Sequence, residues 1–265
     1  MNEVNEKENT DVTEISEEAG KMSFLDHLDE LRKRLVRIAI YLAVGFIVGF
    51  YFSTDLYNFL ADSIRDEIIR VGGQLSYTKP TGAFVMSMRV SLLASVFLTL
   101  PFTLFEVWKF ISPGLYRKEK KYAIPFILSS VVLFLSGAAF CYKIVQPNAF
   151  KFLIEWGEKF KDVTPIIQID EYLDLVIAML LGFGLVFEMP VIIAFLSLFG
   201  LVSASFLLKK FNYAILCIFI LAAILSPTGD AFNLLLWSAP MIVLYIISIG
   251  IAAIIGRRRK KKGLV

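Results

Sequence analysis

Long apolar stretches separated by short charged segments are the main pattern of this chain of 265 residues. Six stretches can be read, at about residues 36–52, 84–105, 123–142, 172–199, 212–226 and 232–255. A helix needs roughly 20 apolar residues to cross a bilayer, and most of these stretches are close to that length or exceed it. Because lipid offers no partner to backbone polar groups, a spanning segment must satisfy them internally as a helix. The pattern therefore predicts an all-α, polytopic membrane protein with six transmembrane helices.

The fifth stretch is shorter than the others. From Phe211 to Leu225 it gives about 22 Å of helix at 1.5 Å per residue. The hydrocarbon core of a bilayer is about 30 Å thick. A span of this length either thins the bilayer locally or lies behind its neighbours.

The segments outside these stretches have patterns of their own. Residues 1–21 are acidic and almost lack apolar side chains, which is typical of a disordered tail. From Ser23 to Leu35, apolar residues recur at helical spacing between charged ones, and they predict an amphipathic helix that lies at the membrane surface and then bends into the first span. Segments 53–83 and 143–171 each predict a short amphipathic helix on the other side, the first one ended by Gly72 and Gly73.

Composition and charge add an orientation. Hydrophobic residues make up 57% of the chain, which leaves few residues for a separate soluble domain beside a membrane domain at 22–256. If both termini are cytoplasmic, 19 of the 27 Lys and Arg residues fall on the cytoplasmic side, including those of a basic tail at 257–265, and 8 fall on the other side. The basic patches suit an anionic lipid bilayer better than nucleic acid, so no nucleic-acid partner is expected.

The residues that usually carry enzyme or metal chemistry are scarce. His27 is the one histidine, and it lies on the predicted surface helix. Cys141 and Cys217 fall in different apolar stretches and are interpreted as buried free thiols. The sequence contains no phosphate-binding loop, no H-E-x-x-H and no C-x-x-C motif. We predict no enzymatic activity, no metal site and no cofactor.

Glu188 is the most informative residue, because it lies inside an uncharged stretch that runs from Leu175 to Leu208. A carboxylate at that depth costs several kcal/mol unless it is neutral, paired or wetted. One interpretation is a hydrogen bond to a Ser or Thr of a neighbouring helix, for example Thr99 or Thr103. The other is a functional groove, since Pro190 is expected to kink the helix beside it.

Two further glutamates, Glu30 and Glu119, lie on the predicted cytoplasmic side among basic residues. Each can be read as a local ion-pair partner, Glu30 with Lys33 or Arg34 one helical turn away. Alternatively, two carboxylates on one face could each hold a guanidinium group through paired hydrogen bonds, which lysine cannot match.

Four segments, in order along the chain, resemble the TatC family, the multi-span receptor subunit of the twin-arginine protein translocase. They are His27-Leu-Asp-Glu-Leu-Arg-Lys-Arg-Leu35, Val107-Trp-Lys-Phe-Ile-Ser-Pro-Gly-Leu-Tyr-Arg-Lys-Glu119, Phe183-Gly-Leu-Val-Phe-Glu188-Met-Pro190 and Leu225-Ser-Pro-Thr-Gly-Asp230. Any one segment alone is weak evidence for the family, but the four together are specific to it. The resemblance runs from about Met22 to Gly256. The chain departs from the family pattern at Ser63, where many relatives have proline, and at Thr81-Gly82, where a glutamate is often found.

The resemblance implies roles for particular residues. The docking site for a twin-arginine signal peptide would comprise Glu30, Arg32, Phe110, Pro113, Leu115, Tyr116 and Glu119. Glu188 matches the intramembrane glutamate of a concave groove. Met189, Pro190 and the span 212–226 are implied to contact single-span subunits of the TatA or TatB type. Asp230 matches an acidic position in a periplasmic turn.

The function implied by the resemblance is that of the core receptor of the translocase. It would bind Arg-Arg signal peptides of folded precursor proteins, self-associate in a multimeric receptor complex, and nucleate export driven by the proton-motive force. The expected location is the bacterial cytoplasmic (inner) membrane, with both termini in the cytoplasm. The six helices are expected to form a cup-shaped bundle. The alternative is a proton-coupled small-molecule secondary transporter that uses Glu188, although such a carrier is expected to show repeated halves and more polar groups at the midplane. A purely structural scaffold would leave the paired surface carboxylates unexplained.

Overall fold

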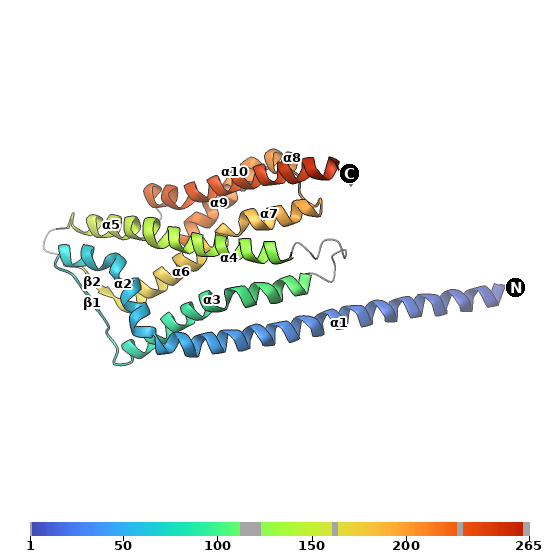
Figure 1. Cartoon of the computed structure of the whole chain (residues 1–265), viewed down its shortest axis with the longest axis horizontal. Helices are drawn as coiled ribbons and strands as arrows, with labels where there is room; N and C mark the ends of the chain where they lie inside the picture. Colours follow the sequence, from blue (N-terminus) through green and yellow to red (C-terminus); the bar gives the residue numbers. More distant parts are fainter. Residues whose placement is uncertain (1, 112–122, 161–163, 227–229, 262–265) are drawn as a thin grey trace.

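Helices running side by side along one long axis make up nearly all of the structure, which is a computed structural model (Figure 1). It describes residues 2–111, 123–160, 164–226 and 230–261, and the side-chain surroundings of 27–110, 124–160, 164–226 and 230–259. The helices are α1 (Asn2–Tyr51), α2 (Ser53–Arg70), α3 (Gly82–Ile111), α4 (Ala123–Phe140), the π-helix η3 (Cys141–Val145), α5 (Gln146–Gly157), α6 (Ile169–Phe187), α7 (Met189–Leu198), α8 (Ala204–Lys209), α9 (Phe211–Leu225) and α10 (Ala231–Lys261). The strands are β1 (Gln74–Ser76) and β2 (Ile166–Gln168), which pair in parallel.

Five helical stretches are long and apolar enough to cross a membrane. They are His27–Tyr51, Gly82–Phe110, Ile124–Gly157, Ile169–Leu198 and Ala231–Arg259. The apolar helix α9 has 15 residues and coincides with the predicted short fifth span. The prediction of an all-α polytopic membrane protein is confirmed. In Figure 1, α1 and α10 extend toward the same end of the bundle, as an even number of passes requires.

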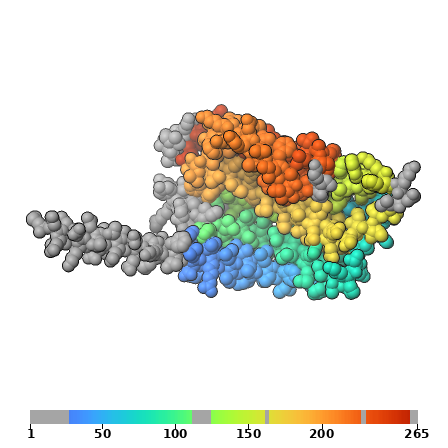
Figure 2. All heavy atoms as spheres, turned by 180° about the vertical axis from the view of Figure 1, so that it is seen from behind, coloured from blue at the N-terminus to red at the C-terminus, as the bar shows by residue number. Residues whose placement is uncertain are grey.

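Large apolar side chains cover the outside of these helices. Among the most exposed are Ile47, Leu128, Leu185, Ile224 and Leu235, each more than half exposed. Apolar patches of this extent are rare on soluble monomers, because water penalises them. They suit a helix bundle whose outer surface faces lipid, and Figure 2 shows one broad side of that bundle.

The packing of α1 against α3 depends on two glycines of α1. A Cβ added to Gly45 would lie 2.8 Å from the Thr99 Cγ2 atom, and one added to Gly49 would lie 3.0 Å from the Ser91 carbonyl oxygen. Small residues spaced four apart let two helix backbones approach closely in a membrane, where water does not drive association. This contact places α1 alongside α3, and it fixes which side chains meet farther along the two helices.

The start of the first span differs from the prediction. Instead of a surface helix that bends into the membrane, the described part of α1 runs unbroken from His27 to Tyr51. Ion pairs and ring contacts with α3, described below, hold its charged turns against the bundle, which gives a physical reason for the missing bend. The helix assignment of α1 begins at Asn2, but the side chains before His27 lie outside those described, so the disordered tail stays a prediction.

At the other end of the bundle, α2 covers the helix ends and is held by buried polar contacts. The Tyr172 hydroxyl donates to the Leu60 carbonyl oxygen across 2.6 Å, and the Gln146 Nε2 atom donates to the Ser63 hydroxyl across 2.6 Å. Gln146 is fully buried at the junction of η3 and α5. α2 ends at Arg70, just before the Gly72-Gly73 pair predicted to terminate it, and Gly72 lies in the left-handed region at φ 69°. The β1–β2 pairing and the π-helix were not predicted.

The fourth span is broken at the predicted place. α6 ends at Phe187 and α7 begins at Met189, with Glu188 between them and Pro190 in the first turn of α7. Proline is tolerated in a first turn because its missing N–H has no partner there, whereas inside a helix it removes a hydrogen bond. The break therefore leaves the Glu188 side chain at the junction of two helical segments within the bundle.

Candidate functional site

Glu30 is half-buried on α1 and is already engaged by a neighbour on the same helix. Its Oε1 atom accepts from the Arg34 Nε atom at 3.2 Å and also from Nη2 of the same guanidinium. The local ion pair that the sequence suggested between Glu30 and Arg34 is therefore present. The Glu30 side chain is 31% exposed and Arg34 only 13%, so the carboxylate is the more accessible partner.

Glu106 of α3 is a carboxylate that the sequence interpretation missed. Its side chain is only 3% exposed, and its Oε2 atom accepts from Arg34 Nη1 at 2.9 Å and from Arg37 Nη1 at 3.4 Å. A buried charge is tolerated when it is paired and hydrogen-bonded, and two arginines of α1 supply that pairing. Arg34 thus bridges two carboxylates, one on each helix.

The ends of α1 and α3 that carry the first two sequence motifs meet through a ring contact. The His27 imidazole stacks on the Phe110 ring, with centroids 4.5 Å apart and planes 19° from parallel. Glu30 lies one helical turn from His27, so it lies at the same end as Phe110. The other predicted docking residues, Pro113, Leu115, Tyr116 and Glu119, lie outside the described residues.

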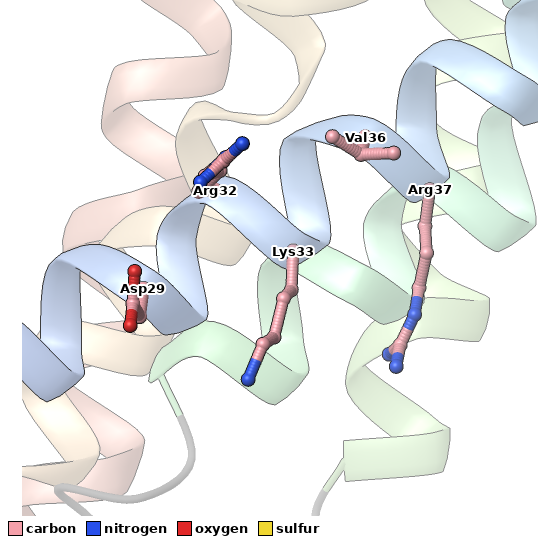
Figure 3. A pocket seen from close by; sticks show the side chains of 5 residues that line it. All are labelled: Asp29, Arg32, Lys33, Val36 and Arg37. Carbon is pink, nitrogen blue, oxygen red and sulfur yellow. The ribbon is translucent and has the colours of Figure 1, made fainter.

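A hollow beside α1 gathers the positive charges of this region. It is lined by Asp29, Arg32, Lys33, Val36 and Arg37. Figure 3 shows Lys33 and Arg37 extending in one direction, while Arg32 extends from the opposite side of the helix. With three cationic groups and one anionic group, the hollow repels guanidinium groups, whereas Glu30, one position from Asp29, offers a carboxylate.

Glu188 sits in the bundle with one of its two oxygens paired. The residue is 9% exposed, and it accepts a hydrogen bond from Ser130 of α4. Its Oε1 atom is buried and has no hydrogen-bond partner among the described residues. The predicted partner type, a Ser or Thr hydroxyl of a neighbouring helix, is confirmed, but the examples Thr99 and Thr103 were wrong. Thr99 donates to the Ser95 carbonyl oxygen on its own helix, and the partner comes from α4, which packs on α6.

The remaining predicted residues have local roles that the structure makes visible. Met189 is half-buried against the core and Pro190 is buried, both in the first turn of α7. Asp230 immediately precedes α10, and its Oδ1 atom accepts from the Asn233 backbone N–H at 2.9 Å. This is N-cap geometry, which satisfies an orphan donor of the first turn. The start of α10, which Asp230 precedes, lies at the opposite end of the bundle from the described end of α3 (Figure 1).

The family model described as "Sec-independent protein translocase protein (TatC)" matches residues 26–240. The TatC protein of Koribacter versatilis is 43% identical over 251 residues, which cover 94% of this chain and 92% of that protein. The TatCy protein of Bacillus subtilis is 33% identical, with 91% and 93% covered. A crystal structure of the twin-arginine translocase receptor TatC in DDM superposes with a TM-score of 0.76, at 34% identity, and covers 85% of this chain and 99% of that one.

Proposed function

This chain belongs to the TatC family of Sec-independent protein translocase proteins, and on that premise we propose that it is the core receptor of a twin-arginine translocase. As a family member it is a multi-pass membrane component of a protein translocase. The proposal adds the binding step: the chain recognises the Arg-Arg signal peptides of folded precursors and nucleates the export complex. No covalent bond is made or broken, so the chain is not an enzyme in this role, and the proton-motive force supplies the energy.

The observation that supports this proposal is the meeting of α1 and α3 at one end of the bundle. There, Glu30 lies one turn from the His27–Phe110 stack, and α3 leads into the segment that carries Glu119. Two carboxylates and an aromatic surface suit a peptide with two arginines and adjacent apolar residues. On this proposal the docking end faces the cytoplasm of a bacterial cell, and both termini lie on that side of the inner membrane.

We place a second binding surface of the protein, for a partner subunit, at the break in the fourth span. The unpaired Oε1 atom of Glu188 can accept a hydrogen bond from a polar side chain of a single-span partner of the TatA or TatB type. Met189, Pro190 and the short helix α9 would form the rest of that contact, within a complex containing several copies of this chain. The alternative, a proton-coupled transporter, gains no support from the relatives, which are named as protein translocase components.

Site-specific photocrosslinking tests the receptor role. A photoreactive phenylalanine analogue placed at Phe110 should crosslink to a precursor with an Arg-Arg signal peptide and much less to the same precursor with Lys-Lys. The same analogue at Phe59, an exposed position of α2 at the opposite end, is the matched control and should crosslink to neither. Equal crosslinking of both precursors at Phe110, or none, would contradict the proposal.

A further inference from the structure

Arg34 occupies the carboxylate that the proposed function assigns to the signal peptide. Its guanidinium bonds to Glu30 Oε1 through two nitrogens, as described above. This is the same chemical group that a twin-arginine peptide presents. A peptide arginine and Arg34 therefore compete for one carboxylate, because a carboxylate has a limited number of acceptor positions.

Glu106 gives Arg34 a second place to bind. The two carboxylates lie on opposite edges of one planar guanidinium, with Nη1 directed to Glu106 and Nη2 to Glu30. If the peptide displaces Arg34 from Glu30, Arg34 stays paired with Glu106, and Glu106 also keeps Arg37. No buried charge is left alone during the exchange, which removes the main energetic obstacle to it.

We propose that Glu106 is a positioning residue for signal-peptide docking, because by holding Arg34 it determines how available Glu30 is. Arg34 acts as an internal competitor of the peptide arginine. Glu106 weakens that competition by sharing the guanidinium, and lysine in the peptide would displace Arg34 poorly because it lacks the planar fork. This inference rests on the proposed receptor function and adds a residue outside the predicted docking set.

The test uses the full chain in lipid nanodiscs and a fluorescent synthetic peptide with an Arg-Arg pair, with fluorescence anisotropy as the readout. Glu106→Gln should weaken peptide binding about threefold, because Glu30 is then the only carboxylate that pairs with the Arg34 charge and is less available to the peptide. The double variant Arg34→Gln/Glu106→Gln removes the internal competitor without leaving a buried charge, and it should bind the peptide about threefold more tightly than the wild type. The gain should disappear when Glu30 is also replaced by Gln, because the competition is for that carboxylate, and a purely structural role would not produce this dependence.

Two controls separate this inference from the proposed function. Asp62→Asn/Arg65→Gln removes an exposed ion pair of α2, at the other end of the bundle, and should leave binding unchanged. Glu30→Gln should weaken binding. If Glu30→Gln weakens binding but Arg34→Gln/Glu106→Gln does not tighten it, the role of Glu106 is wrong and the receptor function stands. If Glu30→Gln leaves binding as it is in the wild type, the docking site itself is wrong, and this inference fails with it.

Discussion

Gly137 on α4 packs so closely against Phe183 on α6 that a Cβ added to Gly137 would lie 2.7 Å from the Phe183 carbonyl oxygen. The Phe187 ring lies equally close to the same position. Backbone cannot move aside as a flexible side chain can, so the pairing of α4 with α6 depends on the absence of a side chain at residue 137.

Gly137→Ala should therefore destabilise the protein, by about 1–3 kcal/mol as is typical of overpacking. The matched control is Gly250→Ala in α10, where a Cβ would meet no atom within 4 Å. That variant should be neutral or stabilise by up to about 1 kcal/mol, because alanine favours a helix over glycine. Thermal unfolding in detergent, followed by circular dichroism, measures both, and a Gly137→Ala midpoint at or above the wild type would contradict the packing.

Helix positions were predictable from the sequence where the signal is long and apolar. The bounds of α9 agree with the stretch from Phe211 to Leu225, and the break at Glu188 follows from Pro190, because proline acts locally on its own helix. Strands β1 and β2 have three residues each, which is too short for a period-two pattern to be distinguished from a loop.

The partners of buried polar groups were not predictable, because they depend on which helices become neighbours. Glu106 follows directly after the predicted second span, so the sequence pattern indicated an ordinary charged residue at the end of a transmembrane helix. Its burial results from α1 lying against α3, which brings Arg34 and Arg37 to it. Likewise Ser130, and not Thr99, bonds to Glu188, because α4 and not α3 supplies the hydroxyl at that depth. A charged residue between Phe105 and Val107 was the one local signal that could have identified Glu106.

Glu30→Ala and Glu119→Ala should each weaken binding of an Arg-Arg signal peptide about tenfold or more. A charge-assisted hydrogen bond contributes roughly 1.5–3 kcal/mol, and each variant removes one carboxylate acceptor. Glu30→Asp should have a smaller effect, since it keeps the charge on a shorter side chain. Pull-down of a tagged precursor from detergent-solubilised membranes gives the comparison, and recovery equal to the wild type with both alanine variants would show that docking occurs elsewhere.

Glu188→Gln should retain part of the export activity, whereas Glu188→Leu should lose more. The amide can still accept from Ser130 and from a partner side chain, but leucine leaves such donors unpaired in apolar surroundings, at about 1–3 kcal/mol each. Export of a reporter precursor into the periplasm provides the measurement. Complete loss in both variants, with precursor binding and partner crosslinking intact, would instead indicate that Glu188 carries a proton.

The two ends of the bundle should react differently with an impermeant thiol reagent in intact cells. Cysteines replacing Asp62 and Lys159, both exposed, should be labelled directly, in a background without Cys141 and Cys217. A cysteine replacing Lys209 should be labelled only after permeabilisation, because the distribution of Lys and Arg places it inside. Ser63 is less suitable for such labelling, since it takes part in the contact with Gln146. The reverse pattern at any of the three positions would overturn the topology.

The unbroken first span connects the two ends of the molecule mechanically. From His27 to Tyr51, α1 has 25 residues, about 37 Å of helix, with no proline to act as a joint. Glu30 lies near one end of this rod, and α2, which covers the opposite end of the bundle, begins two residues after the other. The close contact of Gly45 and Gly49 with α3 lies between these two ends and sets the position of the helix against α3. α1 is therefore one continuous rod, so a single helix fixes the distance between Glu30 and the start of α2 on opposite sides of the bundle.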